Sequence, residues 1–334
     1  MDAGCVNGTE TDPAIMLAAT VIAPGRIEMQ RVAVPEPGPK QVRVRLEGCG
    51  VCASNLPPWE GRPWFNYPMP AGDLGHEGWG RIDALGNEVN DFAVGDRVAM
   101  LSTNAYAQYT IASAEALLAL PPGRTSDLPF PGEPLACAMN IFSRSGIGKG
   151  DTVAILGIGF LGALLTQLAT EAGAKVIAIS RRSYSLQIAE QCGAWKTMLL
   201  DEKLSMVKEV LDATGGKLCN VTIEATGHQV PLDLAGELTR ERGRLIIAGY
   251  HQDGPCLVNL QLWNWRGLDV INAHERDPAI YLKGMKLALE AVLNGNLDPS
   301  RLYTHHFQLF QLSEALAITA RRPPGFVKAL ILFQ

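Results

Sequence analysis

Hydrophobic positions change their spacing along the chain, and the N-terminal third has the spacing of strands. Over residues 16–46 short apolar runs are separated by turns rich in proline and glycine. Within 42–46 valine and leucine alternate with arginine, which is typical of a strand with one solvated face. The same style continues over residues 78–100, and a further hairpin is expected over 105–120. The first 120 residues therefore predict an antiparallel β domain, and residues 1–14 form a polar segment before its first strand.

Beyond residue 133 the pattern changes to helices that alternate with buried apolar strands. A helix is predicted over 133–146, and strands follow at 152–156, 175–179, 221–224, 245–248 and 268–273. Strands alternating with helices predict a parallel, doubly wound sheet, so the fold class is α/β. The C-terminal part predicts a helix over 278–294, a strand over 304–310, a helix over 312–320 and a strand over 327–333. The last strand is expected to return to the β domain.

A glycine-rich turn directly follows the first strand of this alternating region. The strand over 152–156 runs into GIGFLG and then into a series of strong helix formers. The first glycine permits a tight turn, the second lets backbone approach a pyrophosphate, and the third lets the helix pack closely on its strand. The free N–H groups at the helix start would hold the phosphates. The alternative is an ordinary βα turn. The predicted dinucleotide-binding residues here are Gly157, Gly159, Phe160, Leu161 and Gly162.

The end of the second strand predicts which dinucleotide is bound. An acidic residue about 20 positions after the glycines usually binds the ribose of NAD. This chain instead has Ser180, Arg181 and Arg182. Arginines favour the 2′-phosphate of NADP, so we expect NADP rather than NAD. The alternative is that both arginines are simply solvated at the start of a helix.

Composition narrows the possible partners. The chain has 334 residues, enough for two domains, with 47% hydrophobic residues and a net charge of −5. No basic run exceeds two residues and no apolar run reaches membrane-spanning length, so neither nucleic acid nor a membrane is expected as a partner. Residues 1–4 lack the basic region of a signal peptide. The seven cysteines are scattered and odd in number, which favours reduced thiols and a cytoplasmic location.

A second glycine-rich stretch contains the candidate metal ligands. Cys52, His76 and Glu77 lie within it, and Ser54 follows the cysteine by two positions. Thiolate, imidazole and carboxylate are zinc ligands, and a catalytic zinc takes three of them. The spacing leaves other interpretations open, namely a buried cysteine and a hydrogen-bonded His-Glu pair. Cys49 and Cys52 form a CxxC, but its sequence context does not fit a redox motif.

Six ordered motifs together resemble a known family. They are GCGVCASN, GHEGWGRIDALG, VGDRV, GEPLACA, GDTVAILGIGFLG and IEATG. The sequence is similar to the zinc-dependent medium-chain dehydrogenases/reductases, the alcohol and polyol dehydrogenase superfamily, from about Ala18 to Leu332. The resemblance implies a GroES-like catalytic domain formed by 1–137 with 276–334, and a Rossmann cofactor domain over 138–275.

The resemblance also implies which residues bind the metal. Cys52 and His76 match two zinc ligands. Glu133 falls where the family places a third ligand or a water-bridging carboxylate. Glu77 matches a glutamate that ligates directly in some members and transiently in others. Cys137, one helical turn after Glu133, is a rival ligand that is more simply explained as facing the core.

The remaining roles concern the proton and the nicotinamide. Ser54 matches the hydroxyl that passes the substrate proton to solvent, and with Glu77 it forms the expected catalytic pair. Thr226, in IEATG, and Gly249, in IAGY, are expected to line the nicotinamide. Family members usually pair through the edge strand, here near residues 268–273, which implies a homodimer or homotetramer.

Two departures from the family pattern change the expectation. The four-cysteine lobe that holds a structural zinc is absent after VGDRV, so one catalytic zinc and no structural zinc are expected. Asn55 replaces the usual aspartate, an expected partner of the zinc histidine, and an amide makes that imidazole less basic. The expected reaction interconverts a secondary alcohol (polyol, cyclitol or sugar-like) and a ketone with NAD(P). The alternatives are a metal-free NADPH-dependent C=C or quinone reductase, and a non-catalytic nucleotide-binding protein.

Overall fold

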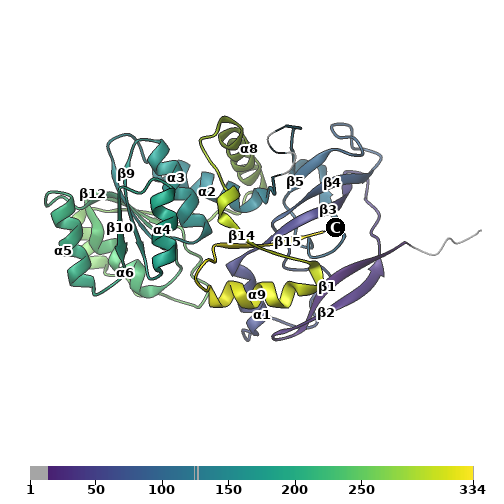
Figure 1. The fold of residues 1–334 in the computed structure, drawn as a ribbon, viewed down its shortest axis with the longest axis horizontal. Coiled ribbons are helices and arrows are strands. Elements are labelled where there is room, and N and C mark those ends of the chain that lie inside the picture. The colour runs from purple at the N-terminus through teal and green to yellow at the C-terminus, as the bar shows by residue number, and fades with distance from the viewer. Residues whose placement is uncertain (1–13, 124, 126–127, 334) are drawn as a thin grey trace, which may run out of the picture.

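The computed structural model describes residues 14–123, 125 and 128–333. Its two large sheets are one that is mainly antiparallel and one that is parallel. The expectations for the polar N-terminal segment and for a signal peptide concern residues 1–13 and lie outside the described residues. Figure 1 shows the two sheets side by side, with the parallel sheet on the left and the antiparallel strands on the right. We call these halves the parallel-sheet lobe and the β lobe.

The β lobe contains a separate hairpin and a seven-stranded sheet. In the sheet β15 pairs with β3 antiparallel and with β14 parallel, so the predicted return of the C-terminal strand is confirmed. The sheet order is β14-β15-β3-β4-β5-β7, with β6 paired to β3. The strands are β1 (Ile15–Ala23) and β2 (Arg26–Ala33), which form the hairpin, then β3 (Gln41–Val51), β4 (Gly78–Leu85), β5 (Arg97–Met100), β6 (Tyr109–Ser113), β7 (Leu117–Ala119), β14 (Tyr303–Phe307) and β15 (Lys328–Leu332). Two helices lie beside them, α1 (Leu56–Glu60) and α9 (Leu312–Arg321).

The prediction of a hairpin over residues 105–120 is wrong. Both predicted strands form, as β6 and β7, but they pair with β3 and β5 respectively and not with each other. Between them a 3₁₀ turn over Ala114–Ala116 is capped by the Ser113 hydroxyl, which accepts a hydrogen bond from the Glu115 N–H. This turn directs the chain onward to another strand instead of back along β6.

The parallel-sheet lobe has the strand order β10-β9-β8-β11-β12-β13, and every pair in it is parallel. This is the doubly wound order with a switch point beside β8. The strands are β8 (Thr152–Leu156), β9 (Lys175–Ser180), β10 (Lys196–Leu199), β11 (Cys219–Glu224), β12 (Thr239–Ile247) and β13 (Asp269–Asn272). The helices are α3 (Phe160–Glu171), α4 (Ser183–Gln191), α5 (Lys203–Ala213), α6 (Gln229–Leu238) and α7 (Leu260–Arg266). The sequence pattern missed β10, because its residues are only partly apolar.

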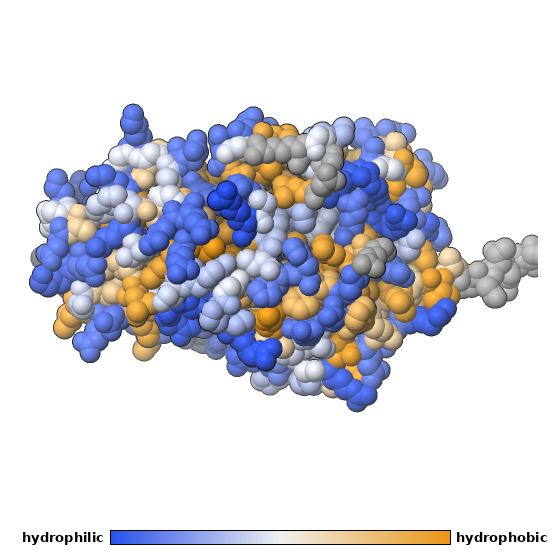
Figure 2. All heavy atoms as spheres, in the orientation of Figure 1, coloured by the Kyte–Doolittle hydropathy of each residue, from blue (hydrophilic) through white to orange (hydrophobic). Residues whose placement is uncertain are grey.

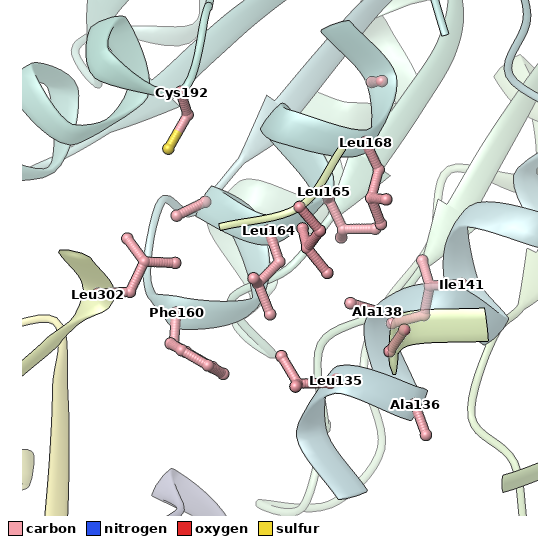
Figure 3. Packing of buried hydrophobic residues seen from close by; sticks show 14 of the residues in the cluster. Leu135, Ala136, Ala138, Ile141, Phe160, Leu164, Leu165, Leu168, Cys192 and Leu302 are labelled. Atoms are coloured by element: carbon pink, nitrogen blue, oxygen red, sulfur yellow. The ribbon is translucent and has the colours of Figure 1, made fainter. Parts of the chain in front are cut away.

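One hydrophobic cluster joins the two lobes. Helices α2 (Gly132–Ser145) and α8 (Pro278–Asn294) lie between them, and α2 packs on both α8 and α3. Figure 3 shows Leu135 and Ala138 of α2 directed towards the same interior as Leu164 and Leu168 of α3. Since this core is continuous, the edge of the parallel sheet is held against the β lobe.

Polar and apolar residues are mixed over the face of the molecule that Figure 2 shows. Figure 2 shows hydrophilic residues spread over the visible face with hydrophobic residues between them. Among the described residues no helix combines the length and the apolar character needed to cross a bilayer.

Candidate active site

Cys52 and His76 converge although separate segments carry them. Cys52 follows the end of β3 and caps a 3₁₀ turn over Ala53–Asn55. Ligand atoms of Cys52, His76 and Glu77 all lie within 4.8 Å of one another. In the described part of the chain this is the one group of at least three such residues that could hold a metal ion. The spacing is compatible with one shared ion.

A backbone carbonyl, and not Asn55, orients the imidazole. His76 Nδ1 lies 2.9 Å from the Leu74 carbonyl oxygen, which leaves Nε2 directed elsewhere. Leu74 has a positive φ of 71°, a conformation that non-glycine residues rarely adopt. A ring nitrogen bonded to a backbone carbonyl is a common arrangement for a metal-binding histidine. The expected partnership of Asn55 with this histidine is therefore wrong.

Asn55 instead connects the surrounding backbone. Its Oδ1 accepts a hydrogen bond from the Cys52 N–H at 3.1 Å and lies 3.0 Å from the Tyr106 hydroxyl. Its Nδ2 donates to the same Leu74 carbonyl at 2.9 Å. The buried amide thus holds both the cysteine turn and the carbonyl that orients His76. An aspartate could not make the donation to Leu74 while ionised, since a carboxylate only accepts.

Three acidic side chains, those of Cys52, Glu133 and Glu77, lie near the imidazole of His76. Burial opposes protonation of His76, but the hydrogen bond to Cys52 and the charges of Cys52, Glu133 and Glu77 outweigh it and raise the pKa to about 10. The surroundings of His76 therefore favour a cation. A metal ion held here would compete with a proton for the imidazole.

Glu77 is fully buried and pairs with a lysine far away in the sequence. Lys328 Nζ on β15 donates to Glu77 Oε1 at 2.6 Å and lies 2.6 Å from Oε2. Oε2 is buried, and its contact with the Lys328 ammonium is an ion pair without an aligned hydrogen bond. A Cβ on Gly50 would lie 1.8 Å from this oxygen, so only glycine leaves room for the carboxylate. The sequence pattern gave no signal for Lys328, since it lies 251 positions from Glu77.

Glu133 lies in the first turn of α2, close enough to His76 to affect its pKa. Burial raises the pKa of the Glu133 carboxyl, and His76 opposes that shift. Cys137 Sγ donates to Glu133 Oε1 at 3.2 Å and lies 3.9 Å from the Tyr281 hydroxyl. The Cys137 thiol is thus enclosed within the protein, where burial raises its pKa, and it contacts the polar groups of Glu133 and Tyr281. Glu133 is outside the group within 4.8 Å.

The glycine turn has the backbone shape that the sequence predicts. Gly157 has φ +100°, and a Cβ on Gly162 would lie 2.0 Å from the Gly157 carbonyl oxygen. A Cβ on Gly159 would meet no protein atom within 4 Å, so space remains in front of this residue. Gly159 caps α3 without a side-chain hydrogen bond, and Phe160 and Leu161 begin the helix. The open space at a helix N-terminus fits a phosphate group.

A buried carboxylate organises the neighbouring strand ends. Glu224, at the end of β11, accepts hydrogen bonds from the Thr226 hydroxyl and the Gly227 N–H, and His251 Nε2 lies 2.9 Å from it. A Cβ on Gly249 would lie 2.2 Å from the Gly227 nitrogen. Thr226 and Gly249 thus lie together at the carboxyl edge of the sheet, the edge from which Gly157 also leaves β8. Glu224 was not predicted from the sequence, although this residue belongs to the IEATG motif.

Of the three residues at the end of β9, Arg182 contacts the β lobe. Ser180 is buried, and its hydroxyl accepts a hydrogen bond from the Arg182 N–H at 3.3 Å. Arg182 crosses to the β lobe and donates to the Phe326 carbonyl at 3.0 Å. Arg181 is exposed. Ser54 is half-buried in the same turn as Asn55, next to Cys52.

Two family models match the chain, and between them they cover more than half of it. Residues 38–122 match the alcohol dehydrogenase GroES-like domain, and residues 161–288 match the zinc-binding dehydrogenase family. The matches fall on the β lobe and the parallel-sheet lobe respectively.

Curated relatives and solved structures agree over almost the full length. A sorbitol dehydrogenase of Halalkalibacterium halodurans is 28% identical, covering 90% of this chain and 94% of that protein. An erythritol/L-threitol dehydrogenase of Mycolicibacterium smegmatis is 27% identical, covering 92% and 95%. A solved alcohol dehydrogenase from E. coli CFT073, complexed with NADH, has a TM-score of 0.85 at 21% identity and covers 96% and 99%. The chain belongs to the zinc-dependent medium-chain dehydrogenase/reductase superfamily and is an oxidoreductase of the alcohol and polyol dehydrogenase type.

Proposed function

We propose that the protein is a zinc-dependent dehydrogenase that interconverts a secondary alcohol and a ketone with a nicotinamide dinucleotide. The observation that carries this proposal is the convergence of Cys52, His76 and Glu77 beside the glycine turn. Lys328 lies between the candidate metal ligands and the glycine turn. Its Nζ pairs with Glu77 and also lies 5.0 Å from the centroid of the Phe160 ring at the start of α3.

The donor set fits zinc. Cys52 Sγ and His76 Nε2 would be two ligands, and the third would be the Glu133 carboxylate or, once its contact with Lys328 is broken, Glu77 Oε2. A zinc ion held here supplies Lewis acidity to a substrate oxygen. The absence of a four-cysteine segment supports one zinc per chain.

The protein groups around this position have separate tasks. Ser54, in the turn after Cys52, would pass the hydroxyl proton towards solvent. Thr226 and Gly249 would hold the nicotinamide at the edge of the sheet, while Gly157 and Gly159 leave space for the phosphates. Each chain group thus binds, orients or carries a proton.

The substrate is proposed to be a polyol, cyclitol or sugar-like alcohol. Polar groups of Glu133, Cys137 and Tyr281 lie together beside the metal position and could bind hydroxyl groups. The relatives named for sorbitol and for erythritol/L-threitol support the same class. Ser180 and the arginines after it support NADP as the preferred dinucleotide, because an acid that would repel the 2′-phosphate is missing.

An exposed apolar surface supports a homodimer. Trp265 and Leu260 on α7 are 79% and 67% exposed, and Val270 on the edge strand β13 is 36% exposed. A surface of this kind next to an unpaired strand edge favours association of two copies.

Metal analysis with activity assays tests the proposal. The purified protein should contain about one zinc per chain and oxidise polyols with NADP. Cys52→Ser should remove both properties, and Cys192→Ser, a substitution remote from the site, should retain them. If Cys52→Ser retains full turnover on activated C=C or quinone substrates, the metal-free reductase is correct. Nucleotide binding without any turnover would favour the non-catalytic alternative.

A further inference from the structure

An exposed cysteine lies beside a histidine and a buried carboxylate in the loop between β12 and α7. Among the cysteines that the structure describes, Cys256 alone is exposed. Its Sγ is 3.3 Å from Nδ1 of His251, and the other ring nitrogen, Nε2, is 2.9 Å from Glu224 Oε2. Thiol, imidazole and carboxylate therefore form one series of contacts. A base beside a thiol, itself oriented by a third group, is the arrangement that activates a cysteine nucleophile.

The buried carboxylate determines which nitrogen of His251 carries the hydrogen. Glu224 is fully buried and accepts hydrogen bonds from the backbone N–H groups of Thr226 at 2.6 Å and Gly227 at 3.0 Å. A carboxylate only accepts hydrogen bonds, so the neutral ring donates to it through Nε2. The lone pair of the ring is then on Nδ1, which faces the Cys256 thiol. His251 thus has the tautomer that can take the thiol proton.

Contacts on both sides fix the loop around Cys256. Before it, Asp253 forms an ion pair with Arg62 of the β lobe at 3.0 Å. After it, the Leu257 N–H donates to the Gln229 side chain at 2.9 Å, and the Gln229 amide donates back to the Leu257 carbonyl at 2.7 Å. Because the backbone is held in this way, the thiol is already oriented towards its base before any reaction.

A surface cavity of about 280 Å³ begins at the residue after Cys256, since Leu257 is part of its wall. The charged residues that line it are Lys203, Asp233 and Glu237. Lys203 pairs with Glu237 at 2.9 Å, so the carboxylate of Asp233 gives the lining an excess of negative charge. The cavity therefore has room for a small molecule next to the thiol and favours one that carries an ammonium group.

We propose that Cys256 is a modification site, where the thiol forms a mixed disulfide with a low-molecular-weight disulfide that carries amino groups. His251 Nδ1 accepts the thiol proton, and the electron pair of the sulfur forms a bond to one sulfur of the disulfide. The original S–S bond breaks, and its electron pair leaves on the second sulfur, which takes the proton from His251. Cys256 is oxidised in this exchange, and the released thiol is the reduced product.

Reaction of the full chain with cystamine, a small disulfide with an amino group at each end, tests the proposal. Mass spectrometry of the digested protein measures the rate at Cys256 separately from the other cysteines. Cys256 of the folded protein should react at least about tenfold faster than Cys256 of the urea-unfolded chain, because only the folded thiol has a base beside it. Equal or slower reaction in the folded protein would overturn the inference, since exposure alone gives no more than the unfolded rate.

His251→Gln should remove most of this advantage, because an amide cannot take the thiol proton. His306→Gln is the matched control, since it removes an exposed histidine of β14, and it should change the rate less than about twofold. Equal rates in His251→Gln and the wild type would contradict the role of the base. Should His251→Gln fail to fold, nitrogen NMR of the wild-type histidine rings decides the same point, because a hydrogen on Nδ1 of His251 would overturn the inference. The exchange needs no dinucleotide, so its failure would leave the proposed function unaffected.

Discussion

Replacing Gly159 by alanine should abolish tight nucleotide binding without harming the fold. Gly159 has φ −94° and ψ −158°, an extended conformation that alanine adopts without strain. The added Cβ meets no protein atom within 4 Å, so no contact in the free protein is disturbed. Its methyl group would, however, occupy the space in front of the α3 N-terminus that we assign to phosphate.

The structure gives the size of each effect. The free energy of unfolding of the nucleotide-free Gly159→Ala protein should stay equal or rise by up to about 1 kcal/mol, because alanine restricts the unfolded chain. The dissociation constant for NADPH should rise at least about tenfold, which corresponds to about 1.4 kcal/mol. Urea unfolding measures the first quantity, and NADPH fluorescence titration measures the second.

Gly162→Ala provides the contrasting variant three positions away. Its Cβ would lie 2.0 Å from the Gly157 carbonyl oxygen and 3.0 Å from the Gly157 carbonyl carbon, so α3 would have to move away from β8. Overpacking of this kind costs about 1–3 kcal/mol of stability. If Gly159→Ala binds NADPH as tightly as the wild type, or if it destabilises the free protein as much as Gly162→Ala does, the assignment of the open space is incorrect.

Three further predictions concern the metal position and the surface. Lys328→Met should lower the free energy of unfolding of the metal-free protein by about 3–5 kcal/mol, because the buried Glu77 carboxyl would lose its ion-pair partner. Urea unfolding should show partial recovery of stability when Glu77→Gln is added. Unchanged stability of the single variant would contradict the pairing. Asn55→Ala should weaken zinc binding by about 10–100-fold in a chelator competition assay, since the cysteine turn and the Leu74 carbonyl lose their common support; wild-type affinity would argue against this support. Trp265→Asp should convert the proposed dimer into a monomer in light-scattering measurements, whereas Leu204→Asp, at a position 84% exposed on α5, should not, and an equal response of both variants would rule out this surface as the interface.

The local features of the fold could be predicted from the sequence, because short-range chemistry determines them. The strand Thr152–Leu156 and the helix Pro278–Asn294 have the predicted bounds, since apolar runs, a proline start and a glycine end mark them directly. The positive φ of Gly157 and the close approach at Gly162 also follow from the residue type and the βαβ context.

Strand pairing over long separations could not be predicted in the same way. The segments that form β6 and β7 have the pattern of a hairpin, and only the tertiary structure assigns them to β3 and β5. Periodicity reports which face of a strand is buried, but it carries no information about which edge the strand will meet.

For the candidate site, the sequence by itself determined the inventory of chemistry. It contains a thiol, an imidazole, carboxylates, a glycine turn and arginines at a strand end, and the order of the motifs connects them with one superfamily. Only the tertiary structure decided which of these groups meet. It brought Lys328 onto Glu77, gave His76 a backbone carbonyl in place of Asn55, turned Cys137 towards Glu133, and put the Phe326 carbonyl within reach of Arg182. The physical reason is that charge pairing and burial depend on distance in space, and residues hundreds of positions apart acquire that distance only when the sheets and helices pack.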